Sequence, residues 1–144
     1  MLVRHQERYN ADLSSLKGII TMGATFERAD CLKVHEFLTP NLFNGYGTTE
    51  TFWNTFLRPY DLPDMSGSAG GSCVDDEVRV VRIYPDRKAE PDDCVPMDGE
   101  TAGEVIIFAP EKTAMCYVAN DEQTREKYYN GWFYTKDVGT WDEN

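Results

Sequence analysis

The stretch Asn41-Leu-Phe-Asn-Gly-Tyr-Gly-Thr-Thr-Glu50 places a short apolar strand directly before a run of glycines, hydroxyls and a carboxylate. Glycines let the backbone approach a ligand closely, and threonine hydroxyls beside exposed N–H groups can hold phosphate oxygens. Glu50 offers the hard oxygen ligands that Mg²⁺ prefers, and Tyr46 offers a flat face to a base. If residues 51–57 form a helical turn, its N-terminus would point at the same anion. In this interpretation, the stretch is a strand, residues 41–46, that ends at a phosphate and metal site.

A second interpretation of the same residues needs no ligand. The pair Asn44-Gly45 is typical of a two-residue type I′ hairpin turn, and the threonines would then be ordinary strand residues. Taken alone, these residues favour the turn, so the choice depends on the sequence around them.

The residues before this stretch predict the end of an α/β layer. The expected elements are a short helix and a turn within 1–16, a buried strand over 17–22 and a helix over 26–38. Thr25 can cap that helix, and Glu27 is favourable in its first turn. The order strand, helix, strand over residues 1–60 is typical of an α/β subdomain.

The residues after the stretch predict a smaller, mainly antiparallel β subdomain over 61–144 with a barrel-like form. The expected elements are a loop over 61–72, a strand over 77–84 with a change of phase at 80–81, a long turn over 85–102, a strand over 103–109, more β structure at 117–119, a helix from Asn120 to Asn130-Gly131, and β structure over 132–141. Asn120 and Gln123 form a capping-box pattern at the start of that helix. The predicted fold class is therefore α/β, with an α/β layer end followed by this β subdomain.

Composition excludes several classes of protein. The 144 residues hold 14 Lys and Arg against 25 Asp and Glu, which gives a net charge of −11. Such a charge repels phosphates and argues against nucleic acid and anionic lipid as partners. Apolar residues make up 41% of the chain, which argues against disorder. No apolar run approaches the roughly 20 residues of a membrane span, and the charged N-terminus predicts no export, so we expect a cytoplasmic protein.

The four cysteines give no metal or redox signature, because Cys31, Cys73, Cys94 and Cys116 lie far apart in the sequence. We expect free, mostly buried thiols, with a disulfide or a metal site as the less favoured alternative.

Several segments together indicate a known family. NGYGTTE resembles the YGxTE signature of the adenylate-forming superfamily, which includes acyl-CoA and aryl-CoA ligases, luciferases and peptide-synthetase adenylation domains. Further segments resemble the same family in the expected order. They are Ser14-Ser-Leu-Lys-Gly18 with Met22-Gly-Ala-Thr25, Gly67-Ser-Ala-Gly70 before the strand at 77–84, Gly103-Glu-Val105, the segment 117–127, and Gly131-Trp-Phe-Tyr-Thr-Lys-Asp137.

Two departures from the family pattern favour one branch. The loop has Met22-Gly-Ala-Thr25 instead of Gly-Gly-Ala-Pro, and Lys136 stands where the family usually has glycine. Both departures resemble halobenzoate-type and related acyl-CoA ligases more than peptide-synthetase domains.

The resemblance implies a role for each matching residue. Glu50 would bind Mg²⁺ and, with Thr49, would be catalytic; Asp137 would accept hydrogen bonds from the ribose hydroxyls. Tyr46 would stack on the adenine. The residues implied to contact ATP or AMP are Gly23, Ala24 and Thr25 at the adenine edge, Asn44, Gly45, Tyr46, Gly47, Thr48 and Thr49 near the base and the α-phosphate, and Asp137.

Each role has an ordinary structural alternative. Asp137 could cap a turn, Tyr46 could be a core aromatic, and Glu50 could be a solvated charge. One wall of the acyl pocket is expected to come from residues next to the signature, although aromatic neighbours there are more often plain core. These wall candidates are Gly45, Thr51, Phe52, Trp53 and Asn54.

The activity implied by the resemblance has two steps. A small-molecule carboxylic acid attacks MgATP to give an acyl-adenylate, and coenzyme A then displaces AMP. Family members are several times longer, with a pyrophosphate-binding loop upstream and a lysine-bearing domain downstream. We therefore expect an internal part of a ligase that is inactive alone and whose partners are the remaining ligase domains. The alternatives are an amino-acid-activating domain that loads a carrier protein, and a non-catalytic binding module.

Overall fold

A computed structural model describes residues 2–114 and 116–143 of the chain, and it divides into two compact units. The first unit holds the residues up to Tyr46 together with Thr55–Gly71. The second unit holds Gly47–Asn54 together with the residues from Ser72 onwards. The predicted subdomains, 1–60 and 61–144, remain a prediction.

The first sheet has the strand order β1-β2-β3-β4. The elements in this part of the chain are α1 (Leu2–Tyr9), β1 (Ile19–Met22), α2 (Arg28–Phe37), β2 (Leu42–Thr48), β3 (Phe52–Leu57), the 3₁₀ turn η1 (Pro59–Asp61) and β4 (Gly71–Ser72). β1 and β2 are parallel, with Ile19 opposite Leu42 and Met22 opposite Gly45. Parallel neighbours need a crossover, which α2 provides. The predicted strand, helix and strand are thus confirmed.

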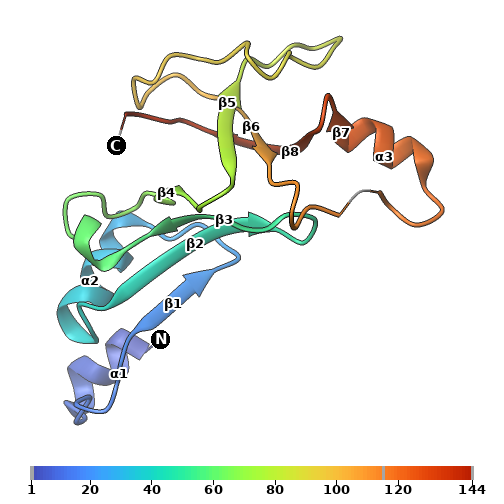
Figure 1. Ribbon diagram of the computed structural model, residues 1–144. Helices are drawn as coiled ribbons and strands as arrows, with labels where there is room; N and C mark the ends of the chain where they lie inside the picture. The colour runs from blue at the N-terminus through green and yellow to red at the C-terminus, as the bar shows by residue number, and fades with distance from the viewer. Residues whose placement is uncertain (1, 115, 144) are drawn as a thin grey trace. The chain divides into compact units, whose positions relative to one another are not determined.

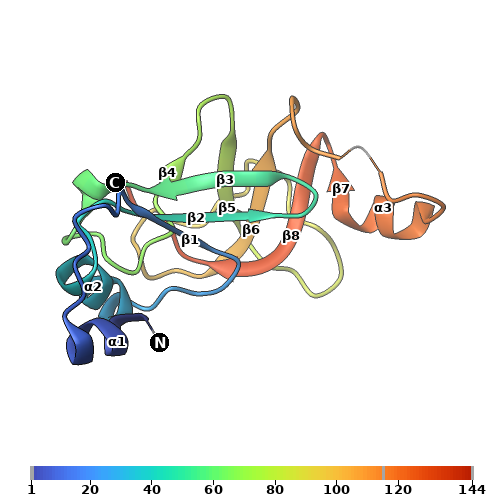
Figure 2. The same cartoon turned by 90° about the horizontal axis from the view of Figure 1, so that it is seen from below.

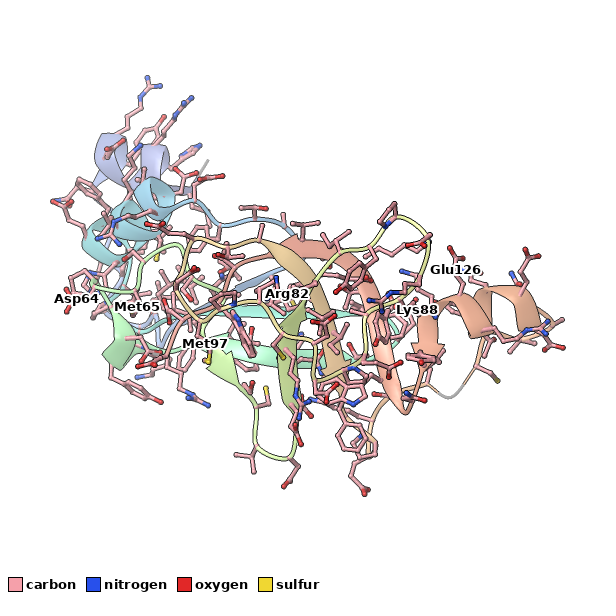
Figure 3. The ribbon with its side chains drawn as sticks, turned by 90° about the horizontal axis from the view of Figure 1, so that it is seen from above. Asp64, Met65, Arg82, Lys88, Met97 and Glu126 are labelled. Carbon is pink, nitrogen blue, oxygen red and sulfur yellow. The ribbon has the colours of Figure 1, made fainter. Side chains whose placement is uncertain are left out.

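The core of the first unit lies between α2 and the strands. Cys31, Leu42 and Leu57 are almost fully buried, and the helices α1 and α2 lie side by side (Figure 2). The residues packed around that centre are Ile19, Phe26, Val34, Leu62 and Met65. Figure 3 labels Met65 next to Asp64, on the loop that follows η1.

The start of α2 differs from the prediction. Glu27, not Thr25, is the N-cap residue, and no side chain caps the helix. A tertiary contact holds the first turn instead, because Arg28 Nη1 donates to the carbonyls of Asp64 at 3.0 Å and Ser66 at 3.1 Å. Capping preference is a local tendency, and this contact outweighs it.

The pair Asn44-Gly45 does not form the hairpin turn that its sequence favours. Both residues lie inside β2, and residues 52–57 form strand β3, so a helical turn over 51–57 is also wrong. The side chain of Asn44 is held across the parallel pair by Thr21, whose hydroxyl donates to Asn44 Oδ1 at 3.0 Å. Pairing with β1 therefore overrides the local turn preference, and the chain turns later, at 49–51.

The second sheet has the order β5-β6-β8-β7, with antiparallel pairing throughout (Figure 1). Its strands are β5 (Glu77–Val81), β6 (Gly103–Phe108), β7 (Tyr128–Tyr129) and β8 (Trp132–Gly139), and the helix α3 (Asp121–Lys127) lies at the β7 end. The predicted mixed α/β class with an antiparallel β part is confirmed. Among the described residues the sheet is open, with β5 and β7 at its edges.

The core of the second unit covers one face of this sheet. Val81, Ala89, Ile106, Trp132 and Tyr134 form its centre. Partly buried residues packed against it are Tyr84, Cys94, Phe108 and Tyr129. The strand predicted over 77–84 ends earlier, at Val81, where both valines of the change of phase are buried.

The limits of α3 confirm one predicted signal and correct another. Asn120 caps the helix as predicted, because its Oδ1 accepts from Gln123 N at 3.0 Å. Asn130-Gly131 does not end the helix, which stops at Lys127. Both residues do take positive φ, 50° and 82°, but as the turn between β7 and β8. Residues 117–119 form no strand.

The four cysteines are free, as predicted, but only Cys31 is buried. Cys73 and Cys94 are half-buried and Cys116 is exposed, so the prediction of mostly buried thiols is wrong.

Within the described residues, no group of His, Cys, Asp and Glu side chains forms a metal cluster. No helix in the same part of the chain is long and apolar enough to cross a membrane.

Candidate functional site

In the first unit, the residues predicted to contact the base gather at the carboxyl ends of β1 and β2. Gly23 follows Met22, which lies opposite Gly45. Parallel strands present their carboxyl ends at one edge, where α/β proteins commonly bind ligands. The exposed residues Gly23, Ala24 and Thr25 leave this edge open, and a Cβ added at Gly23 would meet nothing within 4 Å.

Asn44 and Tyr46 differ in how far the structure already uses them. Asn44 is only 7% exposed, and its amide donates to the Ser68 carbonyl at 3.3 Å while accepting from Thr21. These contacts show that the Asn44 side chain links β2 to β1 and to the loop at Ser68. Tyr46 is half-buried and is the last residue of the first stretch of this unit. This burial fits a ring with one face packed against the protein and the other face open to a ligand.

In the second unit, a polar network shapes the turn between β2 and β3. The hydroxyls of Thr48 and Thr51 lie 3.0 Å apart, and Thr51 N donates to Thr48 Oγ1 at 3.2 Å. The Thr51 hydroxyl donates to Asn54 Oδ1 at 2.6 Å, and both side chains are fully buried. Thr49 is exposed at the tip of the turn. A Cβ on Gly47 would lie 1.6 Å from the Phe52 carbonyl oxygen, so only glycine fits there.

The network continues to a buried ion pair. Asn54 Nδ2 donates to Asp76 Oδ2 at 3.0 Å, and Lys112 Nζ lies 2.7 Å from the same oxygen. The Asp76 side chain is only 4% exposed. Lys112 also donates to the Trp53 carbonyl. The turn is therefore fixed by contacts with two distant parts of its own unit.

Glu50 is held at both its backbone and its carboxylate. Its carbonyl accepts from Ala114 N at 2.7 Å, and Tyr117 donates its hydroxyl to Glu50 Oε1. Burial alone would raise the pKa of Glu50, but hydrogen bonds from Tyr117 and Thr48 and the charge of Lys127 outweigh it and hold the pKa below its usual value. Glu50 is therefore an ionised, half-buried carboxylate rather than a freely solvated charge.

The donors around Glu50 fit a hard cation. A carboxylate beside threonine hydroxyls supplies oxygen ligands only, the set that Mg²⁺ prefers. Burial, then the Glu50 hydrogen bond, raise the pKa of Tyr117, which keeps its hydroxyl protonated and able to donate. Glu50 could thus hold Mg²⁺, with Thr48 and the exposed Thr49 beside it.

Asp137 is the last residue of a bulge in β8. Residues 135–137 of β8 stand against Val105 alone, between the pairs Ile106 with Tyr134 and Glu104 with Val138. Such bulges redirect side chains and are frequent beside functional sites. Thr135 Oγ1 donates to the Val105 carbonyl at 2.8 Å and accepts from Asp137 N at 2.9 Å. Asp137 is exposed, so its carboxylate can reach a ligand.

Charged groups tie the bulge to α3. Lys136 forms an ion pair with Glu126, and its N–H donates to Glu104 Oε1 at 3.0 Å. Lys88 lies beside Glu126 (Figure 3) and donates to the Arg125 carbonyl at 2.8 Å. Lys136 has a φ of 68°, which explains why glycine is common at this position in the family that the sequence resembles.

The comparison with protein families decides the membership of this chain. Residues 1–118 match the family described as AMP-binding enzyme. The chain belongs to the AMP-binding enzyme family.

The relatives of this AMP-binding chain include CoA ligases. A long-chain-fatty-acid–CoA ligase from Yersinia pestis is 27% identical over 99% of this chain and 24% of its own length. An amide bond synthetase from Marinactinospora thermotolerans has a TM-score of 0.79 at 26% identity, over 99% of this chain and 27% of that one. An anthranilate CoA ligase, solved in complex with anthranoyl-AMP, has a TM-score of 0.75 at 26% identity, over 93% of this chain and 24% of that one. The AMP-binding chain thus spans about a quarter of the length of these relatives.

Family membership leaves the role of each residue as a prediction. The structure brings Gly23–Thr25 to the edge that holds Gly45, and it groups Thr48, Thr49 and Glu50 at one turn. Of the acyl-wall candidates, Thr51 and Asn54 are buried and bonded to each other, whereas Phe52 is 61% exposed and stacks on Trp53.

Two residues of the AMP-binding chain that contact the turn were not predicted from its sequence. Lys112 and Tyr117 contact the turn through side chains, although they lie 59 and 67 positions away from their partners. Tyr117 belongs to a segment that resembles the family, and that resemblance is the signal that could have singled it out.

Proposed function

We propose that this chain is the nucleotide-binding part of an ATP-dependent, AMP-forming acyl- or aryl-CoA ligase that acts in the cytoplasm on a small carboxylic acid. The observation that carries the proposal is Glu50, an ionised carboxylate fixed beside the exposed Thr49 in a chain of the AMP-binding enzyme family. The names of the relatives support the reaction class, since one is a fatty-acid CoA ligase and another was solved with an acyl-adenylate.

In the proposed reaction, the substrate carboxylate attacks the α-phosphorus of ATP, which gives an acyl-adenylate and pyrophosphate. The thiol of coenzyme A then attacks the acyl carbon, which gives the thioester and AMP. Thr49 would donate its hydroxyl to the α-phosphate, and Glu50 would hold the metal ion. Mg²⁺, when bound, neutralises charge on the phosphates. Thr48 already bonds to Thr51, so its main task is to shape the turn.

The adenosine part of ATP would supply binding energy away from the reacting atoms. Tyr46 would stack on the adenine, with Gly23–Thr25 at the edge of the base. Asp137 would accept hydrogen bonds from the ribose hydroxyls. Asn44, Gly45 and Gly47 would contribute through the shape of the strand.

The rest of the machinery would lie in other parts of a longer protein. The chain spans about a quarter of its relatives, and the family resemblance implies a pyrophosphate loop and a catalytic lysine elsewhere. We propose that those ligase domains are the partners of this chain.

The test is an ATP–pyrophosphate exchange assay on the full-length protein that carries this chain. A panel of fatty, aryl and amino acids would be offered with MgATP, and we expect exchange with a fatty or aryl acid that Glu50→Gln reduces at least tenfold. Exchange with amino acids alone would favour a carrier-loading enzyme, and no exchange with any acid would favour a non-catalytic module.

The acceptor in the second step needs its own assay, because one solved relative is an amide bond synthetase. We expect preformed adenylate to give a thioester with coenzyme A. If product forms only with amines, the acceptor in the second step is an amine and not coenzyme A.

A further inference from the structure

Three residues that follow β6 hold the turn that carries Glu50 from one side. Lys112, Ala114 and Tyr117 contact residues of the turn, and we name these three the clasp. Ala114 N donates to the Glu50 carbonyl at 2.7 Å, and Tyr117 donates to the Glu50 carboxylate. The same residue is thus fixed at its backbone and at its functional group.

The clasp also fixes the far side of the turn. Lys112 donates to the Trp53 carbonyl and pairs with Asp76, which in turn accepts from Asn54. Because Asn54 bonds to Thr51, the contacts form a continuous path through the turn.

The clasp is anchored in regular structure at both ends. Between Lys112 and Ala114, Thr113 N donates to the carbonyl of Ala109, the residue directly after β6, at 2.9 Å. At its end, Tyr117 N donates to Thr124 Oγ1 at 3.0 Å, within α3. A side chain placed by a sheet and a helix can hold its partner more exactly than one on a free loop.

We propose that Tyr117 is a positioning residue for Glu50. Its hydroxyl holds the carboxylate in one orientation, so that the ion bound with ATP meets a prearranged ligand. This inference rests on the proposed function. Partners that orient a metal ligand without touching the metal commonly contribute 10–100-fold to metal affinity or activity. Tyr117 would act through Glu50 and not on the substrate itself.

The chain offers a matched control in Tyr128. Its ring packs edge-to-face against Tyr117 with centroids 6.4 Å apart. Its hydroxyl is buried and has no hydrogen-bond partner within residues 2–114 and 116–143. Tyr117→Phe and Tyr128→Phe therefore remove the same atom from neighbouring rings, but only the first removes a bond to Glu50.

The experiment is calorimetric titration of ATP into the full-length protein, with and without Mg²⁺. In the wild type, Mg²⁺ should raise ATP affinity. In Tyr117→Phe this gain should fall about tenfold, while affinity without Mg²⁺ stays within a factor of about two. Tyr128→Phe should match the wild type in both titrations. A general loss of structure would lower affinity in both conditions, so it is distinguished from lost positioning.

If Mg²⁺ raises the ATP affinity of Tyr117→Phe as much as that of the wild type, the inference is overturned. The double variant with Glu50→Gln adds a second readout, because Tyr117→Phe should have no further effect once the carboxylate is gone. A full effect in that background would also overturn it. If the wild type and Glu50→Gln bind MgATP equally well, the proposed role of Glu50 fails, whatever Tyr117 does.

Discussion

Asp76 joins three segments of the second unit through one carboxylate. It accepts from Asn54 and pairs with Lys112, and its side chain is almost fully buried. A buried charge that loses its partner costs several kcal/mol, and an unsatisfied buried amide adds to that. Because Lys112 is partly exposed, we expect Asp76→Ala to lower the free energy of unfolding by about 2–3 kcal/mol.

Glu77 is the matched control, since its ion pair with Arg79 lies at the surface. Glu77→Ala should change the free energy of unfolding by less than about 0.5 kcal/mol in the same urea titration. Equal effects of the two variants would show that the path through Asp76 does not stabilise the turn.

Asp98 gives a pH dependence whose sign follows from its contacts. Its carboxylate accepts from the Thr101 hydroxyl at 2.7 Å and from the N–H groups of Thr101 and Glu100, and these bonds lower its pKa to about 2. A pKa lower in the folded state than in the unfolded state gives stability that is present above about pH 4 and lost as pH falls towards about 2.

We therefore expect the wild type to be more stable than Asp98→Asn at pH 5. This gap, the difference between their free energies of unfolding, should narrow between about pH 4 and about pH 2. Urea unfolding of both proteins across this range measures the gap. A constant gap would mean that the carboxylate does not titrate with folding.

At the scale of elements, the bulge in β8 places a lysine in a conformation that suits glycine. Lys136 has a φ of 68°, and a Cβ there costs about 1 kcal/mol. Its ion pair with Glu126 is exposed and contributes little. We expect Lys136→Gly to be more stable than Lys136→Ala by about 1 kcal/mol in thermal unfolding, since both variants lack the ion pair. Alanine as the more stable variant would contradict the assigned backbone strain.

Regular elements were predictable where one local signal dominated. The strand at 103–108 holds the continuous apolar run 105–108, and the Asn120 cap is a side-chain bond within one turn of helix. The parallel pair of β1 and β2 followed from the order strand, helix, strand.

Predictions failed where distant residues decide the local structure. Asn44-Gly45 is a turn by local preference, but Thr21 and the pairing with β1 keep it extended. Asn130-Gly131 tolerates positive φ and is typical of a helix end, yet β7 and β8 use it for a hairpin turn. The bond from Tyr117 to Glu50 spans 67 positions, and no spacing rule predicts it.

At the scale of the whole molecule, the chain covers about a quarter of the length of its relatives. The family resemblance implies that the pyrophosphate loop and the catalytic lysine lie in other parts of a longer protein. We expect the isolated 144 residues to show no ATP–pyrophosphate exchange with an acid that the full-length protein activates. The phosphate contacts made by those other parts would be absent, so the transition state would lose charge stabilisation. Turnover by the isolated chain would contradict this expectation.

The most direct measurement is a crystal structure of the full-length protein with AMP and Mg²⁺. We expect adenine on Tyr46 and beside Gly23–Thr25, the phosphate at Thr49 and the ribose hydroxyls on the carboxylate of Asp137. A nucleotide bound elsewhere, or bound with Asp137 out of reach of its ribose, would contradict these residue roles.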